Sequence, residues 1–261
     1  DNGVAAHGGI EAARQLGIEV LVTDHHLPGT ELPRCSVMVN PNLAGSAFPS
    51  KSLAGVGVAF YLMAALTRRV ESLRGQRQPA AADLLDLVAL GTVADVVRLD
   101  RNNRILVDEG IKRIRAGRCC AGILALAEVS GRDPRTVSAR DLGFSLAPRL
   151  NAAGRIDDMT VGIRCLATDE PAEARAIAAQ LHQLNQDRRG IEEKMRAEAL
   201  DMLRRVRIEE GSLPAGVALL DDGWHPGVVG LVASRMKDRV HRPVAAFAPA
   251  DGDELRGSVR S

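Results

Sequence analysis

Two adjacent histidines and a carboxylate follow the first β-branched run of the chain. That run spans Ile18–Thr23, and Asp24, His25 and His26 come directly after it. The carboxyl ends of parallel strands are where α/β proteins bind ligands, and imidazole and carboxylate groups are common metal ligands. The pattern therefore favours a metal or phosphate site, with the alternative that the histidines only cap a strand.

Two further aspartates could contribute to such a site. Asp95 stands within the otherwise apolar run Leu90–Val97, where a carboxylate is costly to bury unless it is hydrogen-bonded, paired or bound to a cation. Asp1 precedes Asn2 and Gly3, which suits the end of a strand. Taken alone, a cap or turn role for Asp95 and a plain loop position for Asp1 remain the simpler interpretations.

A glycine-containing segment in the middle of the chain carries groups suited to phosphate. It is expected to be a loop that runs from Asn151 to Arg155, just after Arg149. The guanidinium group matches the geometry of a phosphate, and glycine lets a backbone approach closely. For either arginine alone, a solvated surface position is the alternative.

A second pair of phosphate-binding patterns lies near the carboxyl end. Gly227 precedes an apolar helix, so that amide groups are left for an anion, and Ser258 and Arg260 offer a hydroxyl and a guanidinium group. Trp224, within the same Gly223–Gly230 string, suits packing and stacking equally well.

Helix and strand patterns alternate in the first part of the chain. This alternation predicts an α/β fold with a parallel sheet. The expected strands are Ile18–Thr23, typical of a buried strand, and Val37–Val39; the expected helices are Gly8–Leu16, Leu53–Val70, Ala81–Leu90, Arg104–Arg115 and Cys119–Val129.

The pattern changes from about Pro171. Apolar residues then recur along one face of a helix that reaches Ile208, with Gly190 as a point where it could kink. Such a helix suits a strut between domains. A second α/β unit follows, with expected strands Val217–Leu220 and Pro243–Phe247 around a helix at Val228–Lys237. We expect domains at residues 1–168 and 211–261, joined by a long helix over 169–210.

Composition narrows the class of protein. The chain has 261 residues, a formal net charge of +1 and 2% aromatic residues, which argues mildly against a whole-surface nucleic-acid binder and against a base-stacking platform. We expect no membrane span and no signal peptide, and the absence of a Cys-x-x-Cys pair favours a cytoplasmic protein. The segment Arg98–Arg118 is locally basic, and it suits either a solvated helix face or a surface that touches DNA.

Taken together, these motifs resemble the DHH phosphoesterase superfamily. The string Thr23–His26 is similar to its signature, and Gly91–Val97 is similar to its later metal-binding motif. The strings Pro148–Arg155, Gly223–Gly230 and Gly257–Ser261 resemble more narrowly the RecJ family of bacterial single-stranded-DNA-specific exonucleases. The implied fold is a parallel-sheet DHH domain joined by a long helix to a smaller, incomplete α/β DHH-associated domain.

The resemblance implies a two-metal enzyme, with Mn²⁺ or Mg²⁺, that removes nucleotides from the 5′ end of single-stranded DNA in repair and recombination. The implied partners are single-stranded DNA, a single-stranded-DNA-binding protein and a helicase. The residues that match the family's functional positions are Asp1, His25 and Asp95 as metal ligands; His26 near the scissile phosphate with Asp24 supporting its neighbours; and Asn151, Arg155, Ser258 and Arg260 as substrate contacts.

Departures from the family also carry expectations. An Asp-x-Asp motif expected upstream and an oligonucleotide-binding domain expected downstream have no counterpart in the chain, so we expect a fragment that lacks one metal site and is inactive or nearly so. The alternatives are another DHH phosphoesterase, such as an oligoribonuclease or a cyclic-dinucleotide phosphodiesterase, or a non-catalytic DNA-binding scaffold. Against the first stands Gly257–Ser261, where those relatives carry a Gly-Gly-His string.

Overall fold

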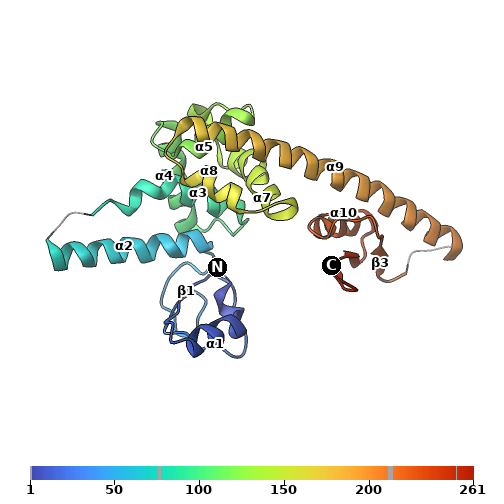
Figure 1. Ribbon diagram of the computed structural model, residues 1–261, viewed down its shortest axis with the longest axis horizontal. Helices are drawn as coiled ribbons and strands as arrows, with labels where there is room; N and C mark the ends of the chain where they lie inside the picture. The colour runs from blue at the N-terminus through green and yellow to red at the C-terminus, as the bar shows by residue number, and fades with distance from the viewer. Residues whose placement is uncertain (1, 76–77, 211–213, 251) are drawn as a thin grey trace. The chain divides into compact units, whose positions relative to one another are not determined.

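The computed structural model has the α/β architecture that the sequence predicts, and it describes residues 2–75, 78–210, 214–250 and 252–261. The chain divides into two compact units, drawn in Figure 1. We call them the N-terminal unit, Asp1–Pro148 with Leu166–Ala174, and the C-terminal unit, Arg149–Cys165 with Arg175–Ser261. Each unit is described by itself.

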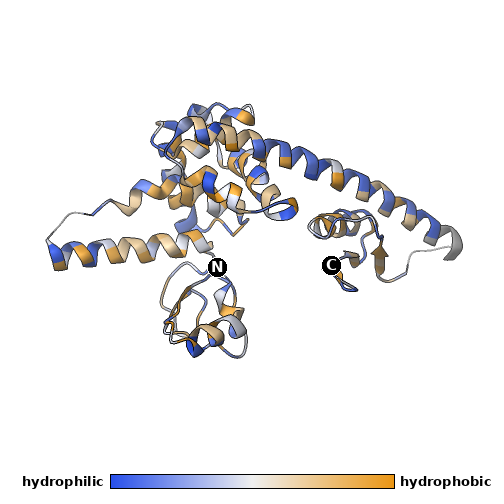
Figure 2. Ribbon diagram, in the orientation of Figure 1, coloured by the Kyte–Doolittle hydropathy of each residue, from blue (hydrophilic) through white to orange (hydrophobic). Residues whose placement is uncertain are grey.

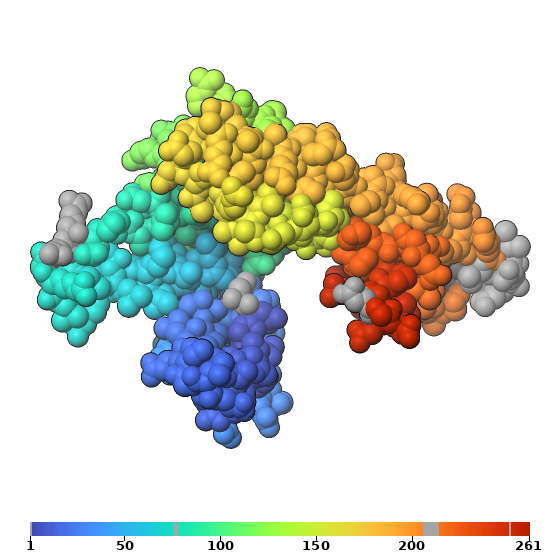
Figure 3. Space-filling model, viewed as in Figure 1, coloured from blue at the N-terminus to red at the C-terminus, as the bar shows by residue number. Residues whose placement is uncertain are grey.

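The N-terminal unit begins with a small parallel sheet. A 3-10 turn, η1 (Gly3–Ala5), and helix α1 (His7–Gln15) lead to strand β1 (Leu21–Thr23), which pairs in parallel with β2 (Val37–Val39). The predicted parallel pairing is confirmed, but β1 starts three residues later than expected. It is also not buried throughout, because Leu21 is 54% exposed while Val22 faces the core. In Figure 3 these first segments form one close-packed lobe, coloured blue.

Helices make up the rest of the N-terminal unit. They are α2 (Gly55–Arg74), η2 (Ala81–Leu84), α3 (Leu85–Ala94), α4 (Arg101–Arg115), α5 (Ala121–Val129), η3 (Pro134–Thr136), α6 (Ala139–Asp141) and the π-turn η4 (Leu142–Leu146). The tightest contact joins α3 to α4, since a Cβ at Gly110 would collide with the backbone of Leu85 and with Ala89. This close packing holds the first half of α3 against the second half of α4.

The predicted loop at Asn151–Arg155 is wrong. Helix α7 (Ala147–Ile156) runs through it, followed by α8 (Thr160–Ala167). Ala152 and Ala153 are both fully buried, and alanine favours a helix once its face is covered. Pro148 lies just after the π-turn η4, where the regular α-helical hydrogen bonds are already interrupted, and this accommodates a residue without a backbone donor.

The predicted long helix is confirmed. Helix α9 (Pro171–Glu210) has 40 residues and continues through Gly190, at which an added Cβ would meet nothing within 4 Å. At 1.5 Å per residue it is about 60 Å long. Figure 2 shows mostly hydrophilic residues along it, as expected for a helix with a narrow apolar stripe.

The C-terminal unit contains a three-stranded sheet. Strand β3 (Val217–Leu220) pairs in parallel with β4 (Val244–Pro249), and β4 pairs antiparallel with β5 (Leu255–Arg260). Helix α10 (Val229–Val240) packs on β4 and β5. The first two strands and the helix were predicted, whereas β5 was treated only as a motif.

The two units do not follow the division expected from the sequence. Residues 149–165 group with most of α9, whereas the predicted division at residue 168 places them in the N-terminal domain. The domain boundaries therefore stay a prediction. None of the described helices combines the length and hydropathy that a membrane crossing requires.

Candidate functional site

A buried carboxylate organises the turn after β1. Asp24 is fully buried, and its Oδ1 accepts hydrogen bonds from the backbone N–H groups of His25 at 2.6 Å and His26 at 2.9 Å. The same oxygen lies 2.8 Å from Nδ1 of His26, while Oδ2 accepts the N–H of Val4 at 2.7 Å. One side chain thus ties the two histidines to the start of the chain.

These bonds keep Asp24 ionised. Burial alone would raise the pKa of Asp24, but the hydrogen bonds from His26, Val4 and His25 outweigh it and hold that pKa well below its ordinary value. A charged carboxylate accepts stronger hydrogen bonds than a neutral acid, so the turn is held firmly. A part of this arrangement depends on Gly3, where a Cβ would come within 2.6 Å of the Val22 side chain.

Two asparagines, which were not predicted as site residues, hold the same turn from the other strand. The side-chain amide of Asn40 donates to the carbonyl of His26 at 2.9 Å, and that of Asn42 donates to the carbonyl of His25 at 2.7 Å. Both follow β2, whose carboxyl end lies beside that of β1. Their place after a parallel strand was the signal that could have identified them.

His25 lies next to Asp95. Its Nε2 is 3.4 Å from Asp95 Oδ2, and the rings of His25 and His26 lie with their centroids 4.4 Å apart. Asp95 is the C-cap residue of α3, which agrees with the cap role that was the simpler interpretation of the sequence, and its side chain is 41% exposed. An imidazole and a carboxylate from two elements are thus brought together at one surface.

The donor set is compatible with a divalent cation but does not by itself complete a site. Within the described ranges, no group of three or more His, Cys, Asp or Glu side chains comes together as a metal cage. Asp1, predicted as a further ligand, lies outside the described residues. Carboxylate oxygens suit Mg²⁺ and Mn²⁺, and the contact between His25 and Asp95 fits two ligands of one ion.

The C-terminal unit brings together the predicted phosphate contacts. Arg155 on α7 reaches the carbonyl of Gly227, with 3.4 Å between its Nη1 and that oxygen. A side chain at Gly227 would collide with the carbonyl of Arg155, so this close approach requires glycine. At Gly230, a Cβ would lie 3.2 Å from Ser258 Oγ and 3.4 Å from Arg260 Nη2. The first turn of α10, the end of β5 and α7 therefore meet.

The cations of this cluster lie close enough to influence one another. Burial is the largest cause that lowers the pKa of Arg155, and the positive charges of Arg188 and Arg260 lower it further, although Glu192 opposes them. Arg188 pairs with Glu192 at 2.6 Å. Neighbouring guanidinium groups at the start of a helix form a surface that an anion would stabilise.

The remaining predicted residues are placed as follows. Trp224 is buried in the core of the unit and its Nε1 donates to Glu198 at 3.0 Å, so the packing interpretation holds. Asn151 is exposed on α7, four residues before Arg155, and shares its face of the helix. His225 accepts the N–H of Gly227 at 3.0 Å and thereby shapes the glycine turn.

The chain is similar to known proteins in both sequence and structure. A model of the DHH family, N-terminal domain, matches residues 1–92. The single-stranded-DNA-specific exonuclease RecJ of Dickeya dadantii (strain 3937) is 55% identical over 266 residues, covering 100% of this chain and 46% of the relative. This chain is similar to RecJ over its whole length, and its first 92 residues match the DHH family. It spans about half the length of that relative.

Solved RecJ structures agree with this similarity. A crystal structure of exonuclease RecJ bound to manganese has a TM-score of 0.83 and 38% identity, covering 100% of this chain and 61% of that one. RecJ from Thermus thermophilus in complex with Mg²⁺ has a TM-score of 0.73 and 38% identity, over 94% of this chain and 34% of that one. The predicted fold and family resemblance are confirmed, whereas the roles of individual residues stay predictions.

Proposed function

We propose that this RecJ-like chain carries the metal-binding and substrate-phosphate residues of a 5′-to-3′ exonuclease that acts on single-stranded DNA in repair and recombination. The observation that carries the proposal is the contact of 3.4 Å between His25 Nε2 and Asp95 Oδ2, on a turn that Asp24 holds in place. RecJ relatives are named for this substrate and are bound to Mn²⁺ or Mg²⁺ in crystals.

In this proposal, His25 and Asp95 hold a cation together with Asp1. Bound there, Mn²⁺ or Mg²⁺ would lower the pKa of water and neutralise charge on the phosphodiester. The two-ion arrangement is part of the proposal. Asn42 and Asp24 keep the His25 backbone fixed, and such outer contacts commonly sustain metal affinity.

His26 is proposed to act on the scissile phosphate. Its Nδ1 faces the ionised Asp24 at 2.8 Å, so the proton of the neutral ring belongs on Nδ1. Nε2 is then left to take up or to return a proton at a phosphate oxygen. Asp24 would stabilise the imidazolium without itself becoming protonated.

Arg155, Ser258 and Arg260 are proposed to bind phosphates of the substrate, with Asn151 on the same helix face as Arg155. A phosphate would relieve the repulsion among the guanidinium groups while accepting hydrogen bonds from them. A single-stranded-DNA-binding protein and a helicase remain proposed partners, and the cytoplasm remains the proposed location.

Substitution of the two proposed ligands tests the function. His25→Ala and Asp95→Ala should each lower Mn²⁺-dependent hydrolysis of 5′-labelled single-stranded DNA by roughly 100-fold or more, because even outer contacts of metal ligands are worth 10–100-fold. DNA binding without metal should remain. The controls are His7→Ala and Asp108→Ala, which change exposed residues of the same types.

Hydrolysis is measured with a full-length protein that contains this sequence, because the chain spans 46% of its relative, and Mn²⁺ binding is measured with residues 1–261 as well. Unchanged hydrolysis in either variant would reject the metal assignment. Robust nucleotide release by residues 1–261 alone would reject the proposal that this segment is inactive by itself.

A further inference from the structure

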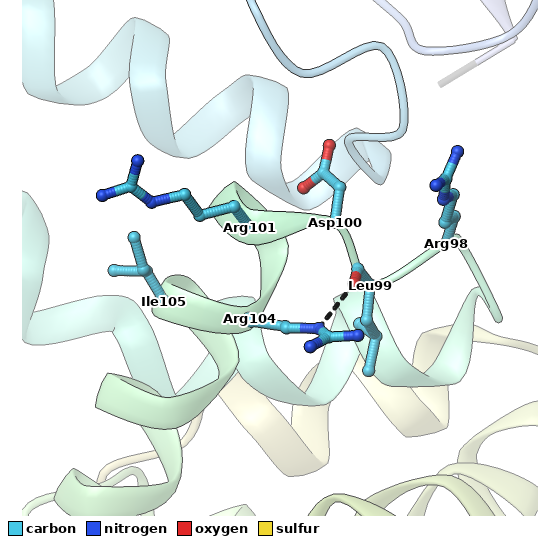
Figure 4. Close-up of a pocket in the computed structure, with 6 residues that line it drawn as sticks. All are labelled: Arg98, Leu99, Asp100, Arg101, Arg104 and Ile105. Atoms are coloured by element: carbon cyan, nitrogen blue, oxygen red, sulfur yellow. Dashed lines mark hydrogen bonds between the residues drawn. The ribbon is translucent and has the colours of Figure 1, made fainter.

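Three arginines surround a hollow at the turn between α3 and α4. Arg98, Arg101 and Arg104 line a surface cavity of about 650 Å³ together with Leu99, Asp100 and Ile105, as Figure 4 shows. All three arginines are exposed. None of them belongs to the metal or phosphate sites described above.

The carboxylate in this hollow is already engaged. Asp100 caps α4, with Oδ1 accepting the N–H of Asn103 at 2.9 Å and Oδ2 accepting the hydroxyl of Ser50 at 2.7 Å. Burial alone would raise the pKa of Asp100, but these bonds and a smaller contribution from Arg98 lower it. Within the described part of the chain, none of the three arginines forms an ion pair within 4.0 Å. The hollow therefore presents cations that are available to a ligand.

The arrangement of the side chains fits a strand of phosphates better than a single phosphate. In Figure 4 the three side chains leave the turn in different directions, and Arg104 is held by a bond of 2.8 Å from its Nε to the carbonyl of Leu99. One phosphate would need guanidinium groups that converge on it. Leu99 and Ile105, the latter 53% exposed, line the same hollow and suit the apolar faces of sugars and bases.

The hollow begins three residues after the proposed metal ligand Asp95. Arg98 follows Asp95 by three residues, so their Cα atoms are separated by at most about 11 Å, because a chain extends no more than 3.6 Å per residue. A strand held at the metal ligand would pass near these arginines.

We propose that Arg98, Arg101 and Arg104 form a binding surface for the sugar-phosphate backbone of single-stranded DNA, separate from the phosphates held by the metal ligands and by the C-terminal cluster. The identity of the polyanion rests on the proposed function. The surface contributes affinity and position without reading sequence, because phosphate contacts carry no base information.

The test compares two triple variants that remove the same charge. Arg98→Ala, Arg101→Ala and Arg104→Ala are combined in one protein; Arg68→Ala, Arg69→Ala and Arg74→Ala on α2 are combined in the control, because these arginines are also exposed. Binding of a fluorescent oligothymidine is measured by anisotropy over a series of salt concentrations in EDTA, so that hydrolysis plays no part.

For the Arg98, Arg101 and Arg104 triple variant, the slope of log K against log salt should be smaller in magnitude by about 2 than for the control triple. Each phosphate contact of a single strand contributes about 0.7 to this slope, and three contacts are lost. Affinity at low salt should fall at least ~10-fold relative to the control triple. Equal slopes and affinities in the two triples would overturn the proposal.

Two safeguards keep the outcome interpretable. If the triple variant shows an altered circular dichroism spectrum, the double variant R98A/R101A replaces it, because Arg104 alone holds a backbone carbonyl; its slope should then change by about 1.4. If the unsubstituted protein itself fails to bind the oligonucleotide, both this surface and the proposed function are rejected. If it binds and the variants match their control, only the surface is rejected.

Discussion

The two candidate sites gather different kinds of side chain. The turn after β1 gathers carboxylate and imidazole groups and holds them by hydrogen bonds to Asp24, Asn40 and Asn42. The cluster in the C-terminal unit gathers guanidinium groups. Gly227 lets its backbone approach that of Arg155, and Gly230 leaves room for the side chains of Ser258 and Arg260. The first arrangement suits a cation and the second an anion.

The difference shows how each kind of site tolerates its own charge. Around Asp24, donors surround one buried carboxylate, so the charge is satisfied before any ligand arrives. Around Arg155, burial and then the neighbouring cations lower its pKa, although Glu192 opposes them, so a bound anion would stabilise the cluster. A substitution that removes hydrogen bonds should therefore damage the first site most. A substitution that adds side-chain volume at a glycine should damage the second site most.

The largest expected effect comes from filling the space at Gly227. Gly227→Ala places a Cβ against the carbonyl oxygen of Arg155, so the turn before α10 must move away from α7. Overpacking at a rigid backbone contact costs about 3 kcal/mol in the free energy of unfolding. Urea denaturation measures this loss, and weaker DNA binding without metal should accompany it.

A second glycine provides the control for that experiment. At Gly190, within α9, an added Cβ would meet nothing within 4 Å. Gly190→Ala should therefore stabilise the protein by up to about 1 kcal/mol, since alanine favours a helix interior. A similar loss of stability in both variants would show that the backbone contact at Gly227 is not what matters.

The next largest effect is expected at Asp24. Asp24→Asn keeps the size of the side chain but can turn an amide N–H₂ group toward the N–H of Val4, leaving two donors face to face. Loss of a charged, buried acceptor costs about 2 kcal/mol, which chemical denaturation can measure. The affinity for Mn²⁺ should fall as well, because His25 and His26 lose their common anchor.

The matched control for Asp24 is an aspartate on the surface. Asp201 forms an exposed pair with Arg204, and Asp201→Asn should change the free energy of unfolding by less than about 0.5 kcal/mol. Equal effects at positions 24 and 201 would contradict the view that hydrogen bonds to one buried carboxylate hold the N-terminal site.

Much of the framework was predictable from the sequence because it depends on local patterns. The run before Asp24 and the run Val37–Val39 have the β-branched composition of parallel strands, and β1 and β2 pair in this way. The spacing of apolar residues from Pro171 predicted a long helix, and α9 matches it closely. The contact between His25 and Asp95 brings together two residues that the sequence had singled out separately.

The features that were missed depend on contacts between distant residues. The glycine in Asn151–Arg155 suggested a loop, but burial of Ala152 and Ala153 favours the helix α7 instead. Strand β5 is stabilised by pairing with β4 and by Gly257, where a side chain would collide with Phe247. Such long-range contacts outweigh local preference.

The smallest expected effect concerns backbone strain beside the N-terminal site. The substitution Val96→Gly tests whether this site carries such strain, unlike the cluster in the C-terminal unit. Val96, directly after Asp95, has a φ of 59°, and its side chain is 86% exposed. A β-branched residue in the left-handed region costs about 1–2 kcal/mol, whereas glycine adopts it freely but loses about 0.5–1 kcal/mol through greater freedom when unfolded. Val96→Gly should therefore stabilise the protein by up to about 1 kcal/mol in denaturant titrations.

The control Val37→Gly, in β2 and 49% exposed, should instead destabilise it by about 1 kcal/mol, since valine favours a strand. If both substitutions destabilise the protein equally, Val96 stores no strain, and the hydrogen bonds around Asp24 alone distinguish the first site from the second.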